Sequence, residues 1–491
     1  MASDDQVGLS VPSALANYIA GELRPPADGG VLDNVEPATG KRLCAVPDSS
    51  ASDLSQALGA AEAALPAWRG MLVERRAQML SRVAAIVERD AEAFARAESA
   101  DTGKPLSLAR TVDIPRAVAN LRFFAAAITQ FHSESHAMAV GAINYTLRQP
   151  LGVVACISPW NLPLYLLTWK IAPALAAGNC VLAKPSELSP ITAHLLSEAC
   201  IEAGLPPGVL NILHGRGPGI GQQLVEAPEV RAISFTGGTE TGRRIAATAA
   251  PRFARLALEL GGKNPTLIFA DADLDQAVDL ALTAAFRNQG EICLCGSRIL
   301  IQRPVYDAVR DRLVSGAQAL TVGDPLSEDT DQGALIGEHH MRKVLGAIEQ
   351  ARGDGGTVLC GGERVRPGGR CADGFFVAPT LIEGLGPACA LNQDEIFGPV
   401  ASLMPFDTEE EALAIANGTP FGLAASVFSQ DVTRCHRVAA QLQSGLVWIN
   451  TWMLRDLRTP MGGVKQSGVG REGGVEAMRF FTEPTNVCIK Y

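Results

Sequence analysis

From Leu151 onward, the chain alternates short apolar segments of strand length with helical segments, joined by short loops of glycine and proline. Strands that are apolar on both faces must be covered on both, which is typical of a parallel sheet between two layers of helices. A second series of this kind runs from Leu256 to about Asn450. The sequence therefore predicts an α/β protein with two sheet-containing domains. The first series has predicted strands at residues 153–157, 180–184, 209–213 and 232–235, and predicted helices at residues 164–177, 191–203, 220–226 and 240–250.

The segment before this alternation, residues 52–131, is predicted to be mostly helical. Ser52 is expected to cap a first helix that ends near Pro66, and the helical period continues through residues 74–96 and 114–131. Residues 142–147 alternate in polarity as a strand does, and the C-terminal residues 486–491 have the composition of a strand that can pair with another subunit.

Composition and charge exclude several classes of protein. The net charge is −10 without a Lys/Arg stripe, so no nucleic-acid partner is expected. The most apolar stretch, residues 151–183, is interrupted by Pro159, Lys170 and Pro173, whereas a membrane span needs about 20 uninterrupted apolar residues. Eleven cysteines without framework spacing, and an acidic start (residues 1–6) without an export signal, predict a cytoplasmic protein with no membrane partner.

Cys293 lies in a glycine-flanked turn between a predicted helix and a predicted strand. A free thiol has a pKa of about 8.5, so it acts as a nucleophile only where a neighbour removes its proton or stabilises the thiolate. Glu259, between leucines and glycines, is short of water and is expected to have a raised pKa, as a general base near neutrality needs. Cys293 and Cys295 could also be metal ligands, but such a site needs about four ligands and no further histidine or cysteine lies near in sequence, so we expect no metal.

Three further motifs each allow two interpretations. The turn Phe235–Gly242 opens a predicted helix and indicates either a pyrophosphate seat or a tight turn that needs small residues. Lys184 and Glu187 follow a strand and are either contacts to ribose hydroxyls or solvated charges. The amide of Asn161 either bonds to the backbone or donates to a developing oxyanion.

Three arginines stand out from the solvated majority. Arg116 follows Asp113-Ile114-Pro115, and Arg455 and Arg458 lie in a turn rich in Trp, Leu and Pro. An arginine in such surroundings is suited to binding a carboxylate through two parallel hydrogen bonds.

Together, these motifs resemble the aldehyde dehydrogenase superfamily over nearly the whole chain. Seven of them occur in the family's order and approximate spacing: Pro159-Trp160-Asn161, Lys184-Pro185-Ser186-Glu187, Phe235-Thr236-Gly237, Glu259-Leu260-Gly261-Gly262-Lys263, Asn288-Gln289-Gly290, Glu395-Ile396-Phe397-Gly398-Pro399 and Gly470-Arg471-Glu472.

The resemblance implies a fold of three parts and an NAD cofactor. A Rossmann-type NAD-binding domain is expected from residues 1–131 and 150–258, an α/β catalytic domain from residues 259–465, and a small β oligomerisation domain from residues 132–149 and 478–491 of a homodimer or homotetramer. Cys293 is then the nucleophile, Glu259 the general base, and Asn161 with the Cys293 N–H the oxyanion hole. The implied NAD-binding residues are Ser158, Trp160, Lys184, Glu187, Gly217, Gly237, Gly238, Glu395 and Phe397.

Finer features resemble one branch of this family, the 2-aminomuconic (or 2-hydroxymuconic) 6-semialdehyde dehydrogenases. These features are Gly290-Glu291-Ile292-Cys293-Leu294-Cys295 and the turn Arg455–Pro460. The resemblance implies NAD-dependent oxidation of 2-aminomuconate 6-semialdehyde to 2-aminomuconate, with Arg116 and Arg455 binding the substrate carboxylate. The alternatives are 2-hydroxymuconic semialdehyde, betaine aldehyde or general aldehydes as substrates, and a non-catalytic structural relative.

This chain departs from the pattern of its relatives at three positions. Gly238 stands where the family commonly has Ser, Met461 where Phe is usual, and Gly296 where the branch often has Thr.

Overall fold

The computed structural model describes residues 11–491. Residues 1–10, which include the acidic start and the beginning of the predicted cofactor-binding domain, lie outside the described residues. No helix within residues 11–491 combines the length and the apolar character that crossing a bilayer requires.

The first large sheet has eight strands with a parallel centre. Its central strand β7 is followed along the chain by β8 and β9 on one side, and then by β10 and β11 on the other, so the strand order reverses between β7 and β10. Ligands of open α/β sheets bind at such a reversal, outside the carboxyl ends of the strands. In spatial order, the strands are β2 (Glu22–Arg24), β1 (Asn17–Ile19), β9 (Leu210–Ile212), β8 (Cys180–Lys184), β7 (Val153–Ile157), β10 (Val230–Thr236), β11 (Arg255–Glu259) and β23 (Gly468–Val469).

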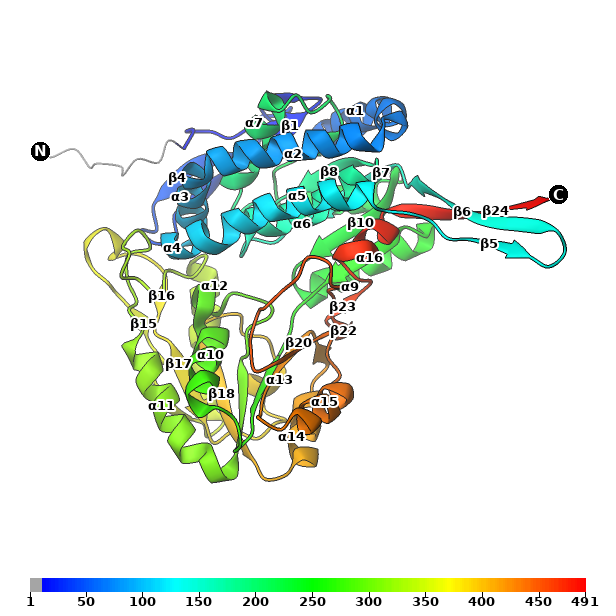
Figure 1. Ribbon diagram of the computed structural model, residues 1–491. Helices are drawn as coiled ribbons and strands as arrows, with labels where there is room; N and C mark the ends of the chain where they lie inside the picture. Colours follow the sequence, from blue (N-terminus) through cyan, green and yellow to red (C-terminus); the bar gives the residue numbers. More distant parts are fainter. Residues whose placement is uncertain (1–10) are drawn as a thin grey trace, which may run out of the picture.

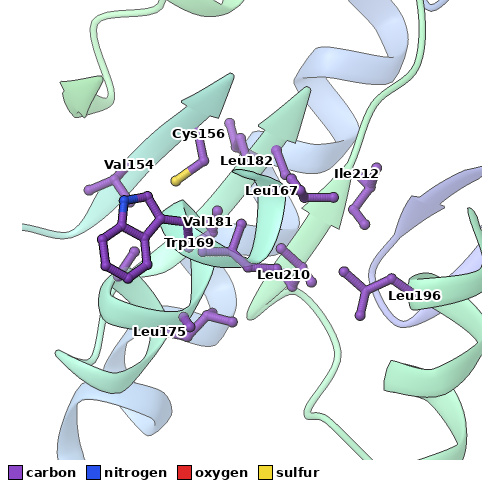
Figure 2. Packing of buried hydrophobic residues seen from close by; sticks show 14 of the residues in the cluster. Val154, Cys156, Leu167, Trp169, Leu175, Val181, Leu182, Leu196, Leu210 and Ile212 are labelled. Atoms are coloured by element: carbon purple, nitrogen blue, oxygen red, sulfur yellow. The ribbon is translucent and has the colours of Figure 1, made fainter. Parts of the chain in front are cut away.

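The core of this half of the molecule lies between the eight-stranded sheet and its helices. Helix α6 is buried along its whole length and is apolar on most sides, as expected of a helix enclosed in a core; its one charged residue, Lys170, is buried as well. Figure 2 shows Leu167, Trp169 and Leu175 of α6 close to Val154 and Val181 of the sheet. The helices of this half are α1 (Ala51–Gly70), α2 (Val73–Arg89), α3 (Ala91–Thr102), α5 (Ile114–Thr129), α6 (Pro163–Ala176), α7 (Ile191–Glu202), α8 (Gln222–Glu226), α9 (Thr239–Ala249) and α16 (Gly474–Phe480).

The second large sheet has seven strands, all parallel except β14. Two separate apolar clusters, one around α10 and α11 and the other around α14 and α15, fill its two faces. In spatial order, the strands are β14 (Thr357–Cys360), β17 (Thr380–Glu383), β18 (Val400–Phe406), β13 (Arg298–Gln302), β12 (Pro265–Ile268), β20 (Ala424–Phe428) and β21 (Leu446–Ile449). The helices are α10 (Leu274–Phe286), α11 (Tyr306–Ala319), α12 (Glu338–Gly353), α13 (Ala390–Gln393), α14 (Glu409–Asn417) and α15 (Val432–Gln441).

A third sheet forms an arm that projects from the body of the molecule (Figure 1). Strand β6 (Ala142–Pro150) lies between β5 (Ser135–Met138) and β24 (Thr482–Lys490). The C-terminal strand predicted to pair with another subunit therefore pairs with β6 of its own chain. These findings confirm the expected α/β class with two parallel-centred sheets, and the domain division stays a prediction.

The boundaries of the N-terminal helices differ from those predicted. Ser50, rather than Ser52, caps α1 in a capping box with Asp53, and α1 continues through Pro66 to Gly70. The predicted helix over residues 74–96 is two helices, because the backbone leaves the helical conformation at Asp90 (φ −100°, ψ 20°). No glycine or proline marks that break, so periodicity alone could not locate it.

Candidate active site

The candidate site residues come from opposite edges of the two large sheets. Lys184 and Glu259 are the last residues of β8 and β11, and Asn161 follows β7, all at the carboxyl edge of the eight-stranded sheet. Cys293 instead lies in the loop before β13, at the amino edge of the seven-stranded sheet. Sequence patterns for βα turns locate the first set, whereas Cys293 is brought to them by how the two sheets meet.

The loop that carries Cys293 has an unusual backbone. Asn288, Gln289 and Gly290 have φ angles of 54°, 55° and 72°, and a side chain at Gly290 would overlap the carbonyl of Gly398. Left-handed backbone is costly at the two non-glycine residues, Asn288 and Gln289, and persists only where their surroundings hold it. Here the Gln289 amide bonds to the backbone of Gly333 and Ala334, with its oxygen accepting and its nitrogen donating.

Every backbone carbonyl from residue 291 to residue 295 accepts a hydrogen bond, so the turn around Cys293 is fixed along its length. The amides of Asn161 and Asn288 donate to Glu291 O, the N–H of Cys295 to Ile292 O, the amide of Asn264 to Cys293 O and Cys295 O, and the indole of Trp452 to Leu294 O. Among residues 11–491, no partner residue accepts the N–H of Cys293 itself. Sequence reasoning missed Asn264 and Trp452.

Cys293 is partly exposed as a whole residue, but its thiol group is strongly desolvated. Burial, followed by the charges of Glu395 and Glu259, raises the pKa of Cys293 to about 12. This arrangement does not stabilise a thiolate before substrate binds, so the thiol proton must leave as the sulfur attacks.

Asn161 is buried, and its side chain donates a hydrogen bond to the backbone, as the first of its two interpretations expected. Its Nδ2 donates to Glu291 O at 2.8 Å, which leaves its second N–H for another acceptor. Its own carbonyl accepts from Lys104 Nζ at 2.9 Å, and Lys104 is fully buried in an ion pair with Asp113 (2.5 Å). This buried cation was not apparent from the sequence.

Glu259 has the environment that its sequence indicated. It is 4% exposed, and neither of its carboxylate oxygens has a hydrogen-bond partner within residues 11–491. Burial, with the nearby charge of Glu472, holds the pKa of Glu259 well above its usual value. A Cβ at Gly462 would lie 2.7 Å from Glu259 Oε1, so only glycine leaves that oxygen free.

A buried ion pair lies near Glu259. Lys170 Nζ contacts Glu472 Oε1 at 2.6 Å, and the Ser234 hydroxyl donates to the same oxygen at 2.8 Å. These partners are 302 residues apart in sequence, which is why no local motif indicated the pair.

Arg116 and Arg455 lie together on aromatic rings. The guanidinium carbon of Arg116 is 5.3 Å from the Tyr165 ring centroid and 5.4 Å from that of Trp169, and that of Arg455 is 5.6 Å from the Trp169 ring. Within residues 11–491, neither arginine pairs with a carboxylate, and Nη2 of Arg116 is buried without a partner. Two adjacent cations without a counter-ion form a site suited to an anion.

Arg458 does not join this pair. Its side chain is 81% exposed and bonds to Asp456 Oδ2 at 2.5 Å. Arg455 instead donates to the hydroxyl of Tyr165 (3.1 Å) and reaches the sulfur of Met461 (2.7 Å). Of the two arginines in this turn, Arg455 is therefore the one that faces the site.

Lys184 and Glu187 form a largely buried pair rather than two solvated charges. Lys184 Nζ is 3.1 Å from Glu187 Oε2, and the N–H of Gly217 donates to Glu187 Oε1 at 3.3 Å. Burial lowers the pKa of Lys184, whereas the charge of Lys184, against the effect of burial, lowers the pKa of Glu187.

Gly237 and Gly238 directly precede helix α9 and differ in the space available for a side chain. A Cβ at Gly237 would overlap the Phe235 ring, but one at Gly238 would meet open space. No side chain within residues 11–491 caps the N-terminus of α9, so the N–H groups of its first turn are left without an intrahelical or side-chain partner there.

Glu395, Phe397 and Trp160 border the Cys293 loop. Glu395 Oε1 accepts from the N–H of Gly262 at 2.9 Å, and burial raises the pKa of Glu395. Phe397 has a φ of 63°, its ring centroid lies 5.3 Å from that of Trp160, and its carbonyl is 2.6 Å from His340 Nε2. Ser158 has a buried hydroxyl without a partner in residues 11–491.

Comparisons with known proteins give one consistent result. Residues 25–487 match the model of the aldehyde dehydrogenase family. The chain is 48% identical to 2-aminomuconic semialdehyde dehydrogenase of Bos taurus (97% of this chain, 98% of that protein) and 44% identical to 2-hydroxymuconic semialdehyde dehydrogenase of Pseudomonas sp. strain CF600 (97% and 99%). Among solved structures, the NAD+ complex of an aldehyde dehydrogenase from Bacillus cereus superposes with a TM-score of 0.94 at 35% identity (97% and 96%).

Proposed function

This chain belongs to the aldehyde dehydrogenase family, and we propose that it oxidises 2-aminomuconate 6-semialdehyde to 2-aminomuconate. It is an NAD-dependent oxidoreductase acting on aldehyde groups, as the family match and the similarity to an NAD+ complex indicate. The chain is similar to both 2-aminomuconic and 2-hydroxymuconic semialdehyde dehydrogenases. This similarity supports a short unsaturated substrate with a carboxylate at one end.

Residues at the carboxyl edge of the first sheet, together with Glu395 and Phe397 from the segment before β18, fit an NAD cofactor. The N–H groups at the start of α9, which no side chain of residues 11–491 caps, favour a pyrophosphate, and the Glu187 and Glu395 carboxylates can accept hydrogen bonds from ribose hydroxyls. The space beside Gly238 leaves room for the phosphates. The proposed NAD-binding site also includes Ser158, Trp160, Lys184, Gly217, Gly237 and Phe397. When bound, NAD+ supplies the hydride acceptor.

In the first step, the sulfur of Cys293 attacks the aldehyde carbon while its proton passes through water to the solvent, giving a thiohemiacetal oxyanion. The N–H of Cys293, which has no acceptor within residues 11–491, and the second N–H of Asn161 stabilise this oxyanion, and donors of this type are worth about 3 kcal/mol each. Loss of a hydride from the same carbon to the bound cofactor would leave Cys293 holding the acyl group as a thioester.

In the second step, Glu259 removes a proton from a water molecule that attacks the thioester. The carboxylic acid is released, and the Cys293 sulfur leaves as a thiolate that takes the proton which Glu259 removed from the water. The raised pKa of Glu259 supports this role, because a general base is most effective when its pKa lies near the operating pH. Because neither oxygen of Glu259 has a hydrogen-bond partner within residues 11–491, the carboxylate has no competing bond to break.

The observation that carries the substrate assignment is the pair Arg116 and Arg455, adjacent and without a counter-ion in residues 11–491. A substrate carboxylate there would be bound by charge-assisted hydrogen bonds worth about 2 kcal/mol. An uncharged aldehyde gains nothing from this pair.

The test is a panel of aldehydes with NADH formation as the readout. We expect a higher kcat/KM for 2-aminomuconic or 2-hydroxymuconic semialdehyde than for betaine aldehyde or unbranched alkyl aldehydes. Equal or better turnover of an uncharged aldehyde would contradict the assignment and favour a general aldehyde dehydrogenase.

We also propose that the chain forms a homodimer or homotetramer in the cytoplasm. The arm of β5, β6 and β24, close to the predicted ranges 132–149 and 478–491, supports an oligomerisation role because β24 leaves one edge unpaired within the described chain.

A further inference from the structure

Asn264 contacts the Cys293 turn more extensively than any role described above explains. It directly precedes β12 and is 3% exposed. Its Nδ2 donates both hydrogens to the turn, to Cys293 O at 2.7 Å and to Cys295 O at 2.9 Å. A single planar amide therefore fixes two carbonyls on either side of Leu294.

Asn264 is itself held rigidly by the second sheet. Its Oδ1 accepts from the N–H of Ala424 at the start of β20 (2.9 Å), and its backbone carbonyl accepts from Arg298 at the start of β13 (3.2 Å). Both neighbouring strands of β12 thus orient the residue. Because every polar group of the side chain has a partner, the amide has one favourable orientation.

The segment that carries Asn264 packs closely against the Cys293 turn. A Cβ at Gly262 would lie 2.8 Å from Asn264 Oδ1 and 2.9 Å from the Cys293 carbonyl, so the segment before β12 touches the turn directly. Only glycine at position 262 permits this approach.

We propose that Asn264 is a positioning residue that fixes Cys293 for attack on the aldehyde. This inference rests on the proposed role of Cys293 as the nucleophile. The two hydrogen bonds set the direction of the Cys293 carbonyl and therefore the placement of its sulfur. A misplacement of about 1 Å at a reacting centre can cost about 100-fold in rate.

The test compares Asn264→Ala with Asn179→Ala. Asn179 lies in the turn after α6 and is fully buried. It donates to the carbonyls of Ala174 (3.1 Å) and Phe481 (3.0 Å) and accepts from the N–H of Gly152 (3.0 Å). Both variants therefore lose two donated bonds and one accepted bond, but only one of them loses bonds to the Cys293 turn. We expect Asn264→Ala to slow pre-steady-state NADH formation by at least about tenfold, with KM for aldehyde and NAD+ within about threefold of wild type.

A second variant, Asn264→Asp, keeps the shape and the acceptor but donates nothing when ionised. Its rate relative to wild type should rise as the pH is lowered from about 8 to about 6, because a protonated carboxyl can donate one bond to the turn. A loss of stability alone would not produce this pH dependence at a temperature where both proteins are fully folded.

Two results would overturn the proposal: a rate for Asn264→Ala within about twofold of wild type, or an equal loss in Asn179→Ala. The Cys293→Ala variant separates this failure from that of the proposed function. If Cys293→Ala is inactive while Asn264→Ala is unimpaired, only the positioning role is wrong. If Cys293→Ala keeps full turnover, the nucleophile assignment itself is wrong.

Discussion

Arg116 and Arg455 face the same Trp169 ring, with guanidinium carbons 5.4 and 5.6 Å from its centroid, although they are 339 residues apart along the chain. Each arginine lowers its electrostatic cost by contact with an aromatic face. Burial, and after it the charge of Arg455 among other neighbours, lowers the pKa of Arg116. An anion placed between them would relieve this repulsion, and the first prediction follows from that.

Arg455→Ala should lower kcat/KM for a carboxylated semialdehyde about 30-fold, which corresponds to about 2 kcal/mol, with little change for an uncharged aldehyde. Arg458→Ala is the matched control, since Arg458 lies three residues away and bonds to Asp456. Steady-state kinetics on both aldehydes give the comparison. Unchanged preference for the acidic substrate in Arg455→Ala would exclude the carboxylate-binding role.

Glu259→Gln keeps the size of the side chain but removes the base. We expect a burst of about one NADH per active site followed by turnover at least about 100-fold slower, because the thioester forms but is not hydrolysed. Stopped-flow absorbance measures both phases. Loss of the burst together with turnover would show that Glu259 is needed before hydrolysis.

The raised pKa of Glu259 also predicts a pH dependence of hydrolysis. A protonated carboxyl cannot accept a proton from water, so hydrolysis should be slow below the pKa of Glu259 and increase as the pH rises through it. The midpoint should lie well above the value of an exposed glutamate, which is about 4.3. Rates of thioester hydrolysis against pH would reveal it, and a midpoint near 4 would contradict the desolvated environment.

Glu395→Gln should make the Cys293 thiol more reactive toward an alkylating reagent in the absence of substrate. After burial, the charge of Glu395 is the largest cause that raises the pKa of Cys293, so its removal lowers that pKa and increases the thiolate fraction at a given pH. Asp394→Asn, at the exposed neighbouring position, should leave labelling unchanged. Labelling can be followed by mass spectrometry, and equal rates in the two variants would argue against this electrostatic coupling.

Gly237→Ala and Gly238→Ala should differ although they are neighbours. The first places a methyl group into the Phe235 ring and is expected to destabilise the fold by about 1–3 kcal/mol, whereas the second meets open space. Thermal unfolding without cofactor distinguishes them. Equal melting temperatures would mean that the Phe235 ring moves aside freely.

Features that depend on local sequence were predictable. The apolar runs that became β7 and β8 had the predicted boundaries, because strands buried on both faces contain little else. The raised pKa of Glu259 also followed from its apolar neighbours. That Arg116 acts together with Arg455 came only from resemblance, since no local pattern relates two residues that meet at Trp169 of α6, one from α5 and the other from a distant turn.

Other features could not be predicted, because they exist only after distant segments meet. The Lys170–Glu472 pair and the two bonds from Asn264 join residues that no periodicity connects. The cap at Ser50 and the break at Asp90 involve single hydrogen bonds and dihedral angles, and several nearby residues would have served equally well by composition.

The most direct test of this account compares NADH formation in Cys293→Ala and Cys295→Ala with the semialdehyde as substrate. Cys295 is buried two residues away and serves as the matched control. We predict that Cys293→Ala loses at least about 1,000-fold in turnover while Cys295→Ala keeps most of it. Full turnover in Cys293→Ala would contradict a mechanism in which the sulfur at position 293 becomes acylated.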